Sequence, residues 1–429
     1  MSNIRGVIVE KGSVGASVEN LDGVSALLIN APAIEVATGI TGIVNGEVYL
    51  FEKLKDAEDH GINAAYDVDN DVRVYRHISE FYRMAGEGTK LYFMAALVTK
   101  DMADMITDHG HALVAGADGE IRYLAVGYSP QSDYTPIYVD GLEDIVREAI
   151  PLAQTLHDWS FETDRPLNVV IEGRGINGLA ASYLDLRGIE ISDVVIPYNN
   201  VSICIGQDWN FAEALEGNSK TYADIGTMLG TRARIQVNYN IGEVGEEGDV
   251  NNLDLSDTKR LVWLTAGLSD HTKIIAREDD LQTINDKGYI FAISYTGISG
   301  YRWNDDHVCA PIIIDADDNM NVHTIALGAA QNKLARLIRQ YLLPKVKSTV
   351  PVDTSTGKLT TGMVKYFEGI ANQAFYEMLA NGEISGGEAI VDPDSDLLTG
   401  DKQLTVSFTM VSTGTIGQIR GTINIKKTL

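Results

Sequence analysis

The glycine-rich run Gly173–Gly178 is the first segment whose residue types and spacing could carry chemistry. It reads Gly-Arg-Gly-Ile-Asn-Gly, follows the apolar residues Leu167–Ile171 and precedes a predicted helix at Leu179–Leu186. This G-x-G-x-x-G spacing could place a pyrophosphate at a helix N-terminus, with Asp193 near the position of a ribose-binding acid. The fingerprint belongs to the first strand of its fold, and this strand comes later. We therefore favour a plain strand-to-helix turn, with a nucleotide-binding α/β enzyme as the alternative.

Three segments rich in acids or histidines suggest metal ligation or catalysis, but each lacks a complete set of groups. Asp315–Asn319 has the alternate oxygens of a calcium loop, but Met320 replaces the turn glycine and Ala326 the closing glutamate. His109–His111 has no further pair with ligand spacing nearby, and Asp305–Cys309 has no matching nucleophile motif. We interpret these segments as loops and solvated turns. We expect no catalytic residue, no metal and no cofactor.

The composition indicates a folded protein with a strongly acidic surface. The 429 residues are 45% hydrophobic and 22% charged, and the formal net charge is −26. Because such a surface repels phosphates, we expect no nucleic-acid partner. No apolar run approaches the roughly 20 residues of a membrane helix and no secretion leader is visible, so we expect no membrane insertion. Two cysteines, Cys204 and Cys309, predict buried thiols in a reducing compartment.

Helices and strands alternate through most of the chain, which predicts a mixed α/β fold with a partly parallel sheet. The predicted strands are Gly23–Ala33, Val48–Phe51, Leu91–Val98, Ile121–Val126, Leu167–Ile171, Asp193–Ile196, Val201–Ile205, Ile290–Tyr295 and Ala310–Ile314. The predicted helices are Lys53–Gly61, Tyr75–Gly86, Asp101–His109, Leu142–His157, Leu179–Leu186, Lys220–Val237, Thr324–Leu343 and Met363–Leu379, followed by a turn at Asn381–Gly387. We divide the chain into an N-terminal arm (1–22), two parts of an α/β body (23–115 and 116–323), a C-terminal helix-plus-strand domain (324–415) and a C-terminal strand arm (416–429).

The two ends of the sequence carry the most informative pattern. Leu404–Val411 and Gln418–Lys426 are strand-like, and the second alternates between an isoleucine-rich face and a polar face. Because a lone strand cannot satisfy its own backbone groups, each end must join a sheet of its own chain or of a neighbour. This favours polymerisation by strand exchange. The residues expected in the inter-subunit strands are Ile4, Val7, Val9, Ile419, Ile423 and Ile425.

A basic row lies along the predicted helix Thr324–Leu343. It consists of Lys333, Arg336 and Arg339. Such a row is most often a solvated helix face, but in so acidic a chain it also fits a docking surface for an acidic partner, such as an inner tube or a neighbouring copy.

The order of these features resembles that of contractile tail sheath proteins, the family shared by contractile-tailed phages and related injection systems. Gly6–Glu10 followed by Gly23–Ile29 is similar to the family's G-V-Y-x-E … G-V-x-T-x-V-x-x-F-x-G start. Further resemblances lie in Val48–Gly61 (D-x-x-x-F-G), Phe81–Val98 (F-F-x-N-G-G), Asn285–Trp303 (N-x-x-G-I-N … G-x-x-x-W-G-A-R-T) and Gly382–Gly387 with the closing strands (L-x-x-G-x-L-x-G). Asn304–His307 replaces the usual G-A-R-T, and His323-Thr324 replaces an arginine pair, so the resemblance is to a divergent member.

The resemblance implies a structural subunit rather than an enzyme. Sheath subunits form stacked six-fold rings around an inner tube, their terminal arms add strands to neighbouring sheets, and contraction drives the tube through a cell envelope. The implied partners are further copies of the chain, the inner tail tube protein, and baseplate and terminator proteins. The implied setting is a virion tail or a cytoplasmic contractile assembly. A non-contractile shell or baseplate-type structural protein is a further alternative.

Overall fold

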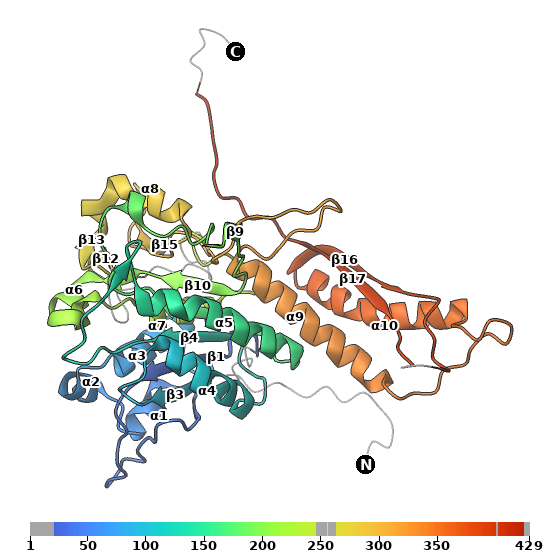
Figure 1. The fold of residues 1–429 in the computed structure, drawn as a ribbon, viewed down its shortest axis with the longest axis horizontal. Helices are drawn as coiled ribbons and strands as arrows, with labels where there is room; N and C mark the ends of the chain where they lie inside the picture. The colour runs from blue at the N-terminus through green and yellow to red at the C-terminus, as the bar shows by residue number, and fades with distance from the viewer. Residues whose placement is uncertain (1–20, 246–254, 256–262, 400–401, 424–429) are drawn as a thin grey trace, which may run out of the picture.

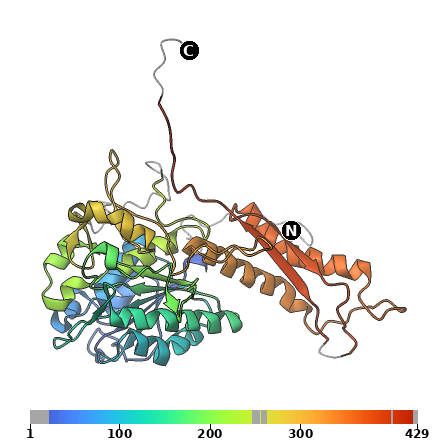
Figure 2. The ribbon, with the colours of Figure 1, turned by 45° about the horizontal axis from the view of Figure 1, so that its top comes forward.

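The computed structural model describes residues 21–245, 255, 263–399 and 402–423. These residues form an α/β body and an elongated C-terminal lobe, which projects from one side of the body (Figure 1 and Figure 2). The mixed α/β prediction is confirmed. Ile4, Val7, Val9 and Ile425, which the sequence assigned to inter-subunit strands, lie outside the described residues.

A six-stranded sheet forms the centre of the body, in the order β10-β7-β4-β1-β3-β2. All neighbours are parallel except β2, which pairs antiparallel with β3 at one edge. The strands are β1 (Ser25–Asn30), β2 (Tyr49–Phe51), β3 (Leu91–Ala96), β4 (Tyr123–Gly127), β7 (Asn168–Glu172) and β10 (Val201–Cys204). Every residue of the five parallel strands is buried, as expected for a sheet that helices cover on both faces.

Two helix pairs enclose this sheet. On one side α4 (Met102–Gly116) packs beside α5 (Asp144–Glu162), and on the other α3 (Val74–Ala85) packs beside α7 (Ile225–Arg234). Between β2 and α3, the short helices α1 (Leu54–Asp59) and α2 (Ala64–Asn70) pack against α3. The helix predicted at Asp101–His109 continues to Gly116, so His109–His111 lies inside a helix and not in the predicted loop.

Smaller elements complete the body. They are β5 (Tyr138–Val139), β6 (Leu142–Glu143), β8 (Glu190–Ile191), β9 (Val194–Val195), β11 (Gly206–Asp208), α6 (Trp209–Glu213), β12 (Ala266–Leu268), β13 (Thr272–Lys273), α8 (Glu278–Asp286), β14 (Ala292–Ile293) and β15 (Arg302–Trp303). Two predictions here were wrong. The helix predicted at Leu179–Leu186 is reduced to a 3₁₀ turn at Ala180–Ser182. The strand predicted at Ala310–Ile314 forms only one bridge, between Ile314 and Met320.

The lobe contains two long helices and a two-stranded sheet: α9 (Ile325–Leu342), α10 (Thr361–Ala380), β16 (Ile384–Val391) and β17 (Val406–Ser412). Helix α10 packs on both α9 and β16. The turn predicted up to Gly387 was wrong, because β16 begins at Ile384. A Cβ at Gly387 would lie 2.2 Å from the Phe375 ring, so only glycine lets this strand approach α10. The strand predicted from Gln418 is not formed in its described part, 418–423.

Candidate functional site

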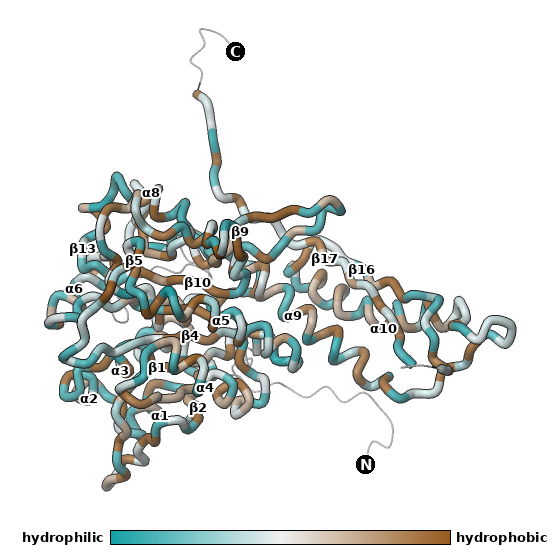
Figure 3. Tube along the Cα trace, viewed as in Figure 1, coloured by the Kyte–Doolittle hydropathy of each residue, from teal (hydrophilic) through white to brown (hydrophobic). Residues whose placement is uncertain are grey.

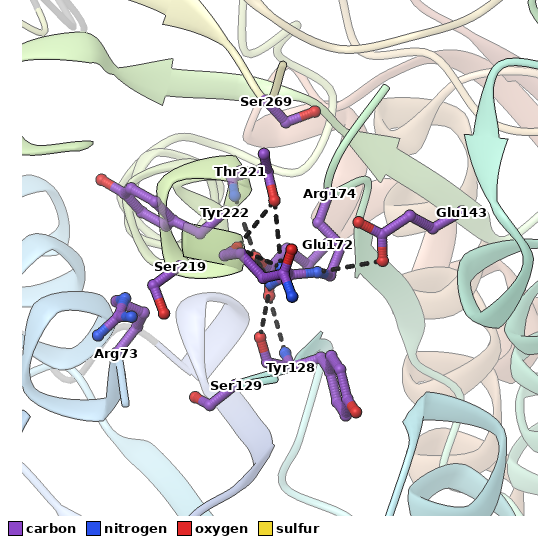
Figure 4. A network of polar contacts seen from close by, with 12 residues as sticks. Arg73, Tyr128, Ser129, Glu143, Glu172, Arg174, Ser219, Thr221, Tyr222 and Ser269 are labelled. Carbon is purple, nitrogen blue, oxygen red and sulfur yellow. Dashed lines mark hydrogen bonds and ion pairs between the residues drawn. The ribbon is translucent and has the colours of Figure 1, made fainter. Parts of the chain in front are cut away.

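Arg174, the second residue of the glycine-rich run, is fully buried at the carboxyl ends of β4 and β7 (Figure 4). Its Nη1 donates to the Tyr128 carbonyl at 3.0 Å, and its Nε pairs with Glu143 at 3.3 Å. A second carboxylate, Glu172, lies 3.7 Å from Nη1. Burial opposes the charge on Arg174, but Glu143 and Glu172 outweigh it and raise the pKa of Arg174. The guanidinium therefore ties β4, β7 and the start of α5 together.

The glycine loop is bonded to the rest of the protein in a way that argues against a phosphate site. Gly175 has a φ of +59°, and a Cβ on it would lie 2.1 Å from Oε1 of Glu143. The loop amides that would bind a phosphate are also occupied, because the N–H of Gly175 donates to the Thr221 carbonyl and that of Asn177 to the Gly141 carbonyl, both at 2.9 Å. The three-residue 3₁₀ turn after the loop also offers no α-helix N-terminus, and Asp193 lies in the exposed turn between β8 and β9. This geometry supports the interpretation as a turn over nucleotide binding.

Glu172 closes the same edge of the sheet, which is where open α/β folds usually bind ligands. Its two oxygens accept the backbone N–H groups of Tyr128 at 2.8 Å and Ala223 at 3.0 Å. Burial raises the pKa of Glu172 to about 7, against the opposing effects of Arg174 and the two amides. In the described residues, the protein's own side chains fill this edge.

A second buried charge cluster joins α3 to α7 and to the strands beyond. Arg76 lies 3.0 Å from Asp224, 3.2 Å from Asp208 and 3.8 Å from Glu80. Arg83, about two turns beyond Arg76 on α3, pairs with Glu80 at 2.6 Å. Because an unpaired buried charge costs several kcal/mol, the cluster specifies how α3 and α7 pack. It is a structural clamp within the body.

His77 lies beside this clamp and makes the body sensitive to acid. It is fully buried, and neither ring nitrogen has a hydrogen-bond partner among the described residues. Burial, with Arg76 and Arg73 nearby, lowers the pKa of His77 to about 3. Below the ordinary value of 6.5, the unfolded chain therefore binds a proton that the folded chain does not, and stability falls as pH falls.

Replacing His77 with Leu is expected to flatten this acid destabilisation. Between pH 6 and 4 the variant should lose about 1.4 kcal/mol less stability per pH unit than the parent, because one differential proton is removed. Denaturant unfolding at several pH values measures both slopes. His111→Leu, on the surface of α4, is the matched control. Parallel slopes for His77→Leu and the parent would show that His77 does not carry the effect.

The basic row of α9 mostly faces acids of its own chain. Lys333 Nζ lies 2.6 Å from both Asp22 and Glu383, and these hydrogen bonds raise its pKa even though burial opposes the charge. Arg336 lies 3.6 Å from Asp22, and burial lowers its pKa to about 9. Arg339 is half exposed and pairs with Asp164. Docking by this row stays a prediction, with Arg339 as its most accessible member.

The remaining residues that the sequence analysis named as candidates are packed into the structure of the body. Asp306 accepts the N–H of Ala326 at 2.9 Å in the first turn of α9, and burial lowers the pKa of His307 to about 4. Cys204 and Cys309 are buried, and burial raises the pKa of both thiols. Within the described ranges, no group of three or more His, Cys, Asp or Glu residues is arranged to hold a metal ion.

The two edges of the β16–β17 sheet differ in a way the sequence did not predict. On β16, the outward N–H groups of Ala389 and Val391 donate to side chains of α10, Asn372 at 2.9 Å and Glu368 at 3.3 Å. Helix α10 therefore closes the β16 edge to a further strand.

The edge of β17 is open. Ala389 pairs with Phe408 and Val391 with Val406, so the alternation of an antiparallel ladder turns the backbone groups of Val406, Phe408 and Met410 outward. None of these outward groups has a hydrogen-bond partner among the described residues. Phe408 is 39% exposed beside them. The arrangement can accept one strand, which would also cover the Phe408 ring.

The chain continues from β17 as residues 413–423, which run away from both body and lobe (Figure 1). Ile419 is 85% exposed and Ile423 is 94% exposed. Within the described part, their alternating apolar face contacts no sheet of its own subunit. The strand-arm role of these residues stays a prediction, and their exposure is compatible with it.

Comparison with known protein families shows to which family this chain belongs. Residues 7–307 match the family described as "DUF2586, N-terminal domain", and residues 330–429 match "DUF2586, C-terminal domain". The chain belongs to the DUF2586 family. No curated protein matches this DUF2586 chain in sequence.

Solved structures place the fold of the DUF2586 chain more specifically. It matches the anti-feeding prophage helical sheath in the contracted state with a TM-score of 0.51 and 12% identity, covering 99% of each chain. It matches a chain of the anti-feeding prophage baseplate with a TM-score of 0.56 and 12% identity, covering 99% of this chain and 100% of the other. The sheath-like fold inferred from the order of sequence features is confirmed. None of the helices among the described residues is long and apolar enough to cross a membrane.

Proposed function

We propose that this protein is a structural, non-enzymatic subunit of a contractile tail or injection apparatus, and that it polymerises as the sheath. In this proposal, six-fold rings of the chain stack around an inner tube and contract to drive the tube through a cell envelope. A baseplate, a terminator and the tube protein are the proposed partners. The fold that this chain shares with sheath and baseplate chains supports the proposal that it belongs to a contractile apparatus.

The observation that carries the proposal is the open edge of β17 in a chain whose last described residues are apolar and uncovered. An edge strand with free N–H and C=O groups accepts an extended segment by main-chain hydrogen bonds. Residues 413–423 extend away from their own subunit, so they are placed to reach a neighbouring copy. We therefore propose that a terminal segment of a neighbouring copy occupies the open edge of β17. Strand addition keeps subunits connected while rigid bodies rotate, as contraction requires.

Replacing Phe408 with Pro tests this edge. Proline removes the outward N–H of residue 408 without removing a bond of the β16–β17 ladder, and proline is tolerated on edge strands. We expect the critical concentration for polymerisation to rise about tenfold, since a lost hydrogen bond with an unpaired partner costs about 1.4 kcal/mol. Light scattering and negative-stain electron microscopy of the purified full chain give the result.

Two matched variants complete this experiment. Phe408→Ala keeps the N–H and should polymerise better than Phe408→Pro. Thr409→Pro removes an inward ladder donor and should lower the thermal stability of the lobe instead. Equal polymerisation by Phe408→Pro and the parent would refute strand addition at β17. Closed rings in place of helical tubes would favour a baseplate-type role.

A further inference from the structure

Helix α9 joins the body to the lobe, and its first turn is held firmly by the body. Figure 2 shows α9 leading out of the body into the lobe. The buried residue Asp306 accepts the first two backbone N–H groups of α9, both at 2.9 Å. Gly328 packs so closely on the body that a Cβ there would lie 2.8 Å from the side chain of Asn168. We call residues 324–328 the pivot.

Beyond the pivot, α9 meets the body through charged side chains. Figure 3 shows hydrophilic colour recurring along the rest of α9. The cations Lys333, Arg336 and Arg339 pair with two acids of the body, and Lys333 also pairs with Glu383 of the lobe at 2.6 Å. These residues form a set that we call the α9 clasp: Asp22, Asp164, Lys333, Arg336, Arg339 and Glu383.

Several buried polar groups around the clasp have no hydrogen-bond partner among the described residues. Asn332 is 2% exposed and lies one turn before Arg336 on the same face of α9, and neither end of its side chain is paired. The same holds for Nη1 of Arg336, Nε of Arg122 and Oε2 of Glu383. Burial and the nearby charge of Arg122 lower the pKa of Arg336 to about 9. Because such groups would gain hydrogen bonds in water, burying them costs free energy.

The ion pairs and the unpaired groups act in opposite directions. The ion pairs hold the lobe in the described arrangement, whereas the unpaired groups oppose it. A rotation of the lobe about the pivot would let water reach Asn332 and Glu383. It would also separate Arg336 from Arg122, and it would break the two hydrogen bonds that Asn238 donates to the lobe. The lobe would move as one piece, because α10 packs on both α9 and β16. The balance between the two arrangements is therefore set by the clasp.

We propose that the lobe rotates about the pivot between a closed arrangement, which the α9 clasp holds, and an open arrangement, in which water hydrates the clasp residues. Ionic strength shifts the balance toward the open arrangement, because salt screens partly exposed pairs such as Arg339 with Asp164 more than it weakens the hydrogen bonds of the pivot. This inference goes beyond the proposed function, since it concerns the single folded chain whether or not the chain polymerises.

Distance measurements between body and lobe test the rotation. Spin labels on Glu148→Cys in α5 and Gln373→Cys in α10 of the full-length, unpolymerised chain report their separation by double electron–electron resonance. Both positions are exposed, and the native Cys204 and Cys309 are buried, so the labels react with the new thiols. At low salt we expect one main distance. In about 1 M NaCl a second distance should appear, with its population raised at least about threefold.

Two substitutions on α9 should move this equilibrium in opposite directions. Lys333→Met leaves the buried carboxylate of Glu383 without its cation, so the open population should rise at least about tenfold. Asn332→Leu removes two unpaired polar atoms, so the open population should fall and the unfolding temperature should rise. Lys365→Met is the matched control, because Lys365 pairs with Glu368 of its own helix, and it should leave the distances at their parent values.

Two results would overturn the inference. The first is a distance distribution that keeps the parent's single peak both in Lys333→Met and at high salt. The second is a broader distribution or a lower unfolding temperature in Asn332→Leu, since Asn332 would then make a contact that the closed arrangement needs. If Lys333→Met does not fold, the salt titration of the labelled parent chain decides between rotation and a rigid junction.

Discussion

Replacing Ile419 and Ile423 with Asp is expected to abolish polymerisation and to leave the folded monomer unchanged. Both side chains are more than four-fifths exposed in the subunit, so the substitutions remove no contact within it. In an assembly, each isoleucine would bury its side chain, which is worth about 1.5–3 kcal/mol. Two buried aspartates would also add charge beside acidic surfaces of a chain with a net charge of −26. The critical concentration should rise at least about a hundredfold.

Electron microscopy, sedimentation and thermal unfolding together measure this result. The matched control is Gln418→Asp with Thr422→Asp, which adds the same charge on the polar face of the alternating segment. This control should polymerise at a moderately higher concentration and unfold at the parent temperature. Normal tubules from the Ile419→Asp, Ile423→Asp chain would exclude the C-terminal segment as an assembly element.

A substitution of Gly226 by Ala is expected to be the most destabilising change in the body. Helices α3 and α7 cross so closely that a Cβ at Gly226 would lie 2.2 Å from the backbone oxygen of His77, and one at Gly230 would lie 2.5 Å from that of Phe81. The contact is with backbone, so no side chain can move away. The helices must separate, which also stretches the pairs of Arg76 with Asp224 and Asp208. The free energy of unfolding should fall by about 3 kcal/mol.

Gly369 provides the contrasting test on α10. It is a helical glycine with open space around the position of a Cβ. Gly369→Ala should therefore stabilise the chain by about 0.5–1 kcal/mol, because alanine loses less backbone entropy in a helix. Denaturant unfolding of Gly226→Ala, Gly369→Ala and the parent measures both changes in the free energy of unfolding. If Gly226→Ala lowers the free energy of unfolding by no more than the experimental error of the measurement, α3 and α7 can separate at little cost.

Much of the body could be predicted from local patterns. The apolar runs at β1 and β3 and the 3.6-residue periodicity of α3 depend only on neighbours along the chain, so their positions were correct within a few residues, and the same holds for α9 in the lobe. Strand β16 was missed because the two adjacent glycines Gly386 and Gly387 are typical of a turn. Only the packing of Phe375 on Gly387 makes that glycine pair part of a strand.

The sequence by itself determined the α/β class, the acidic charge, the order of elements and the alternating isoleucines of the C-terminal segment, because composition and periodicity are local properties. The tertiary structure alone decided which charges pair across the fold. It paired Arg174 of the glycine-rich run with Glu143, and it paired Lys333 with Asp22 and Glu383. It also closed the edge of β16 with Asn372 and Glu368 and left that of β17 open. These contacts join residues far apart in the chain, and their geometry follows from how helices and strands pack, which no local pattern records.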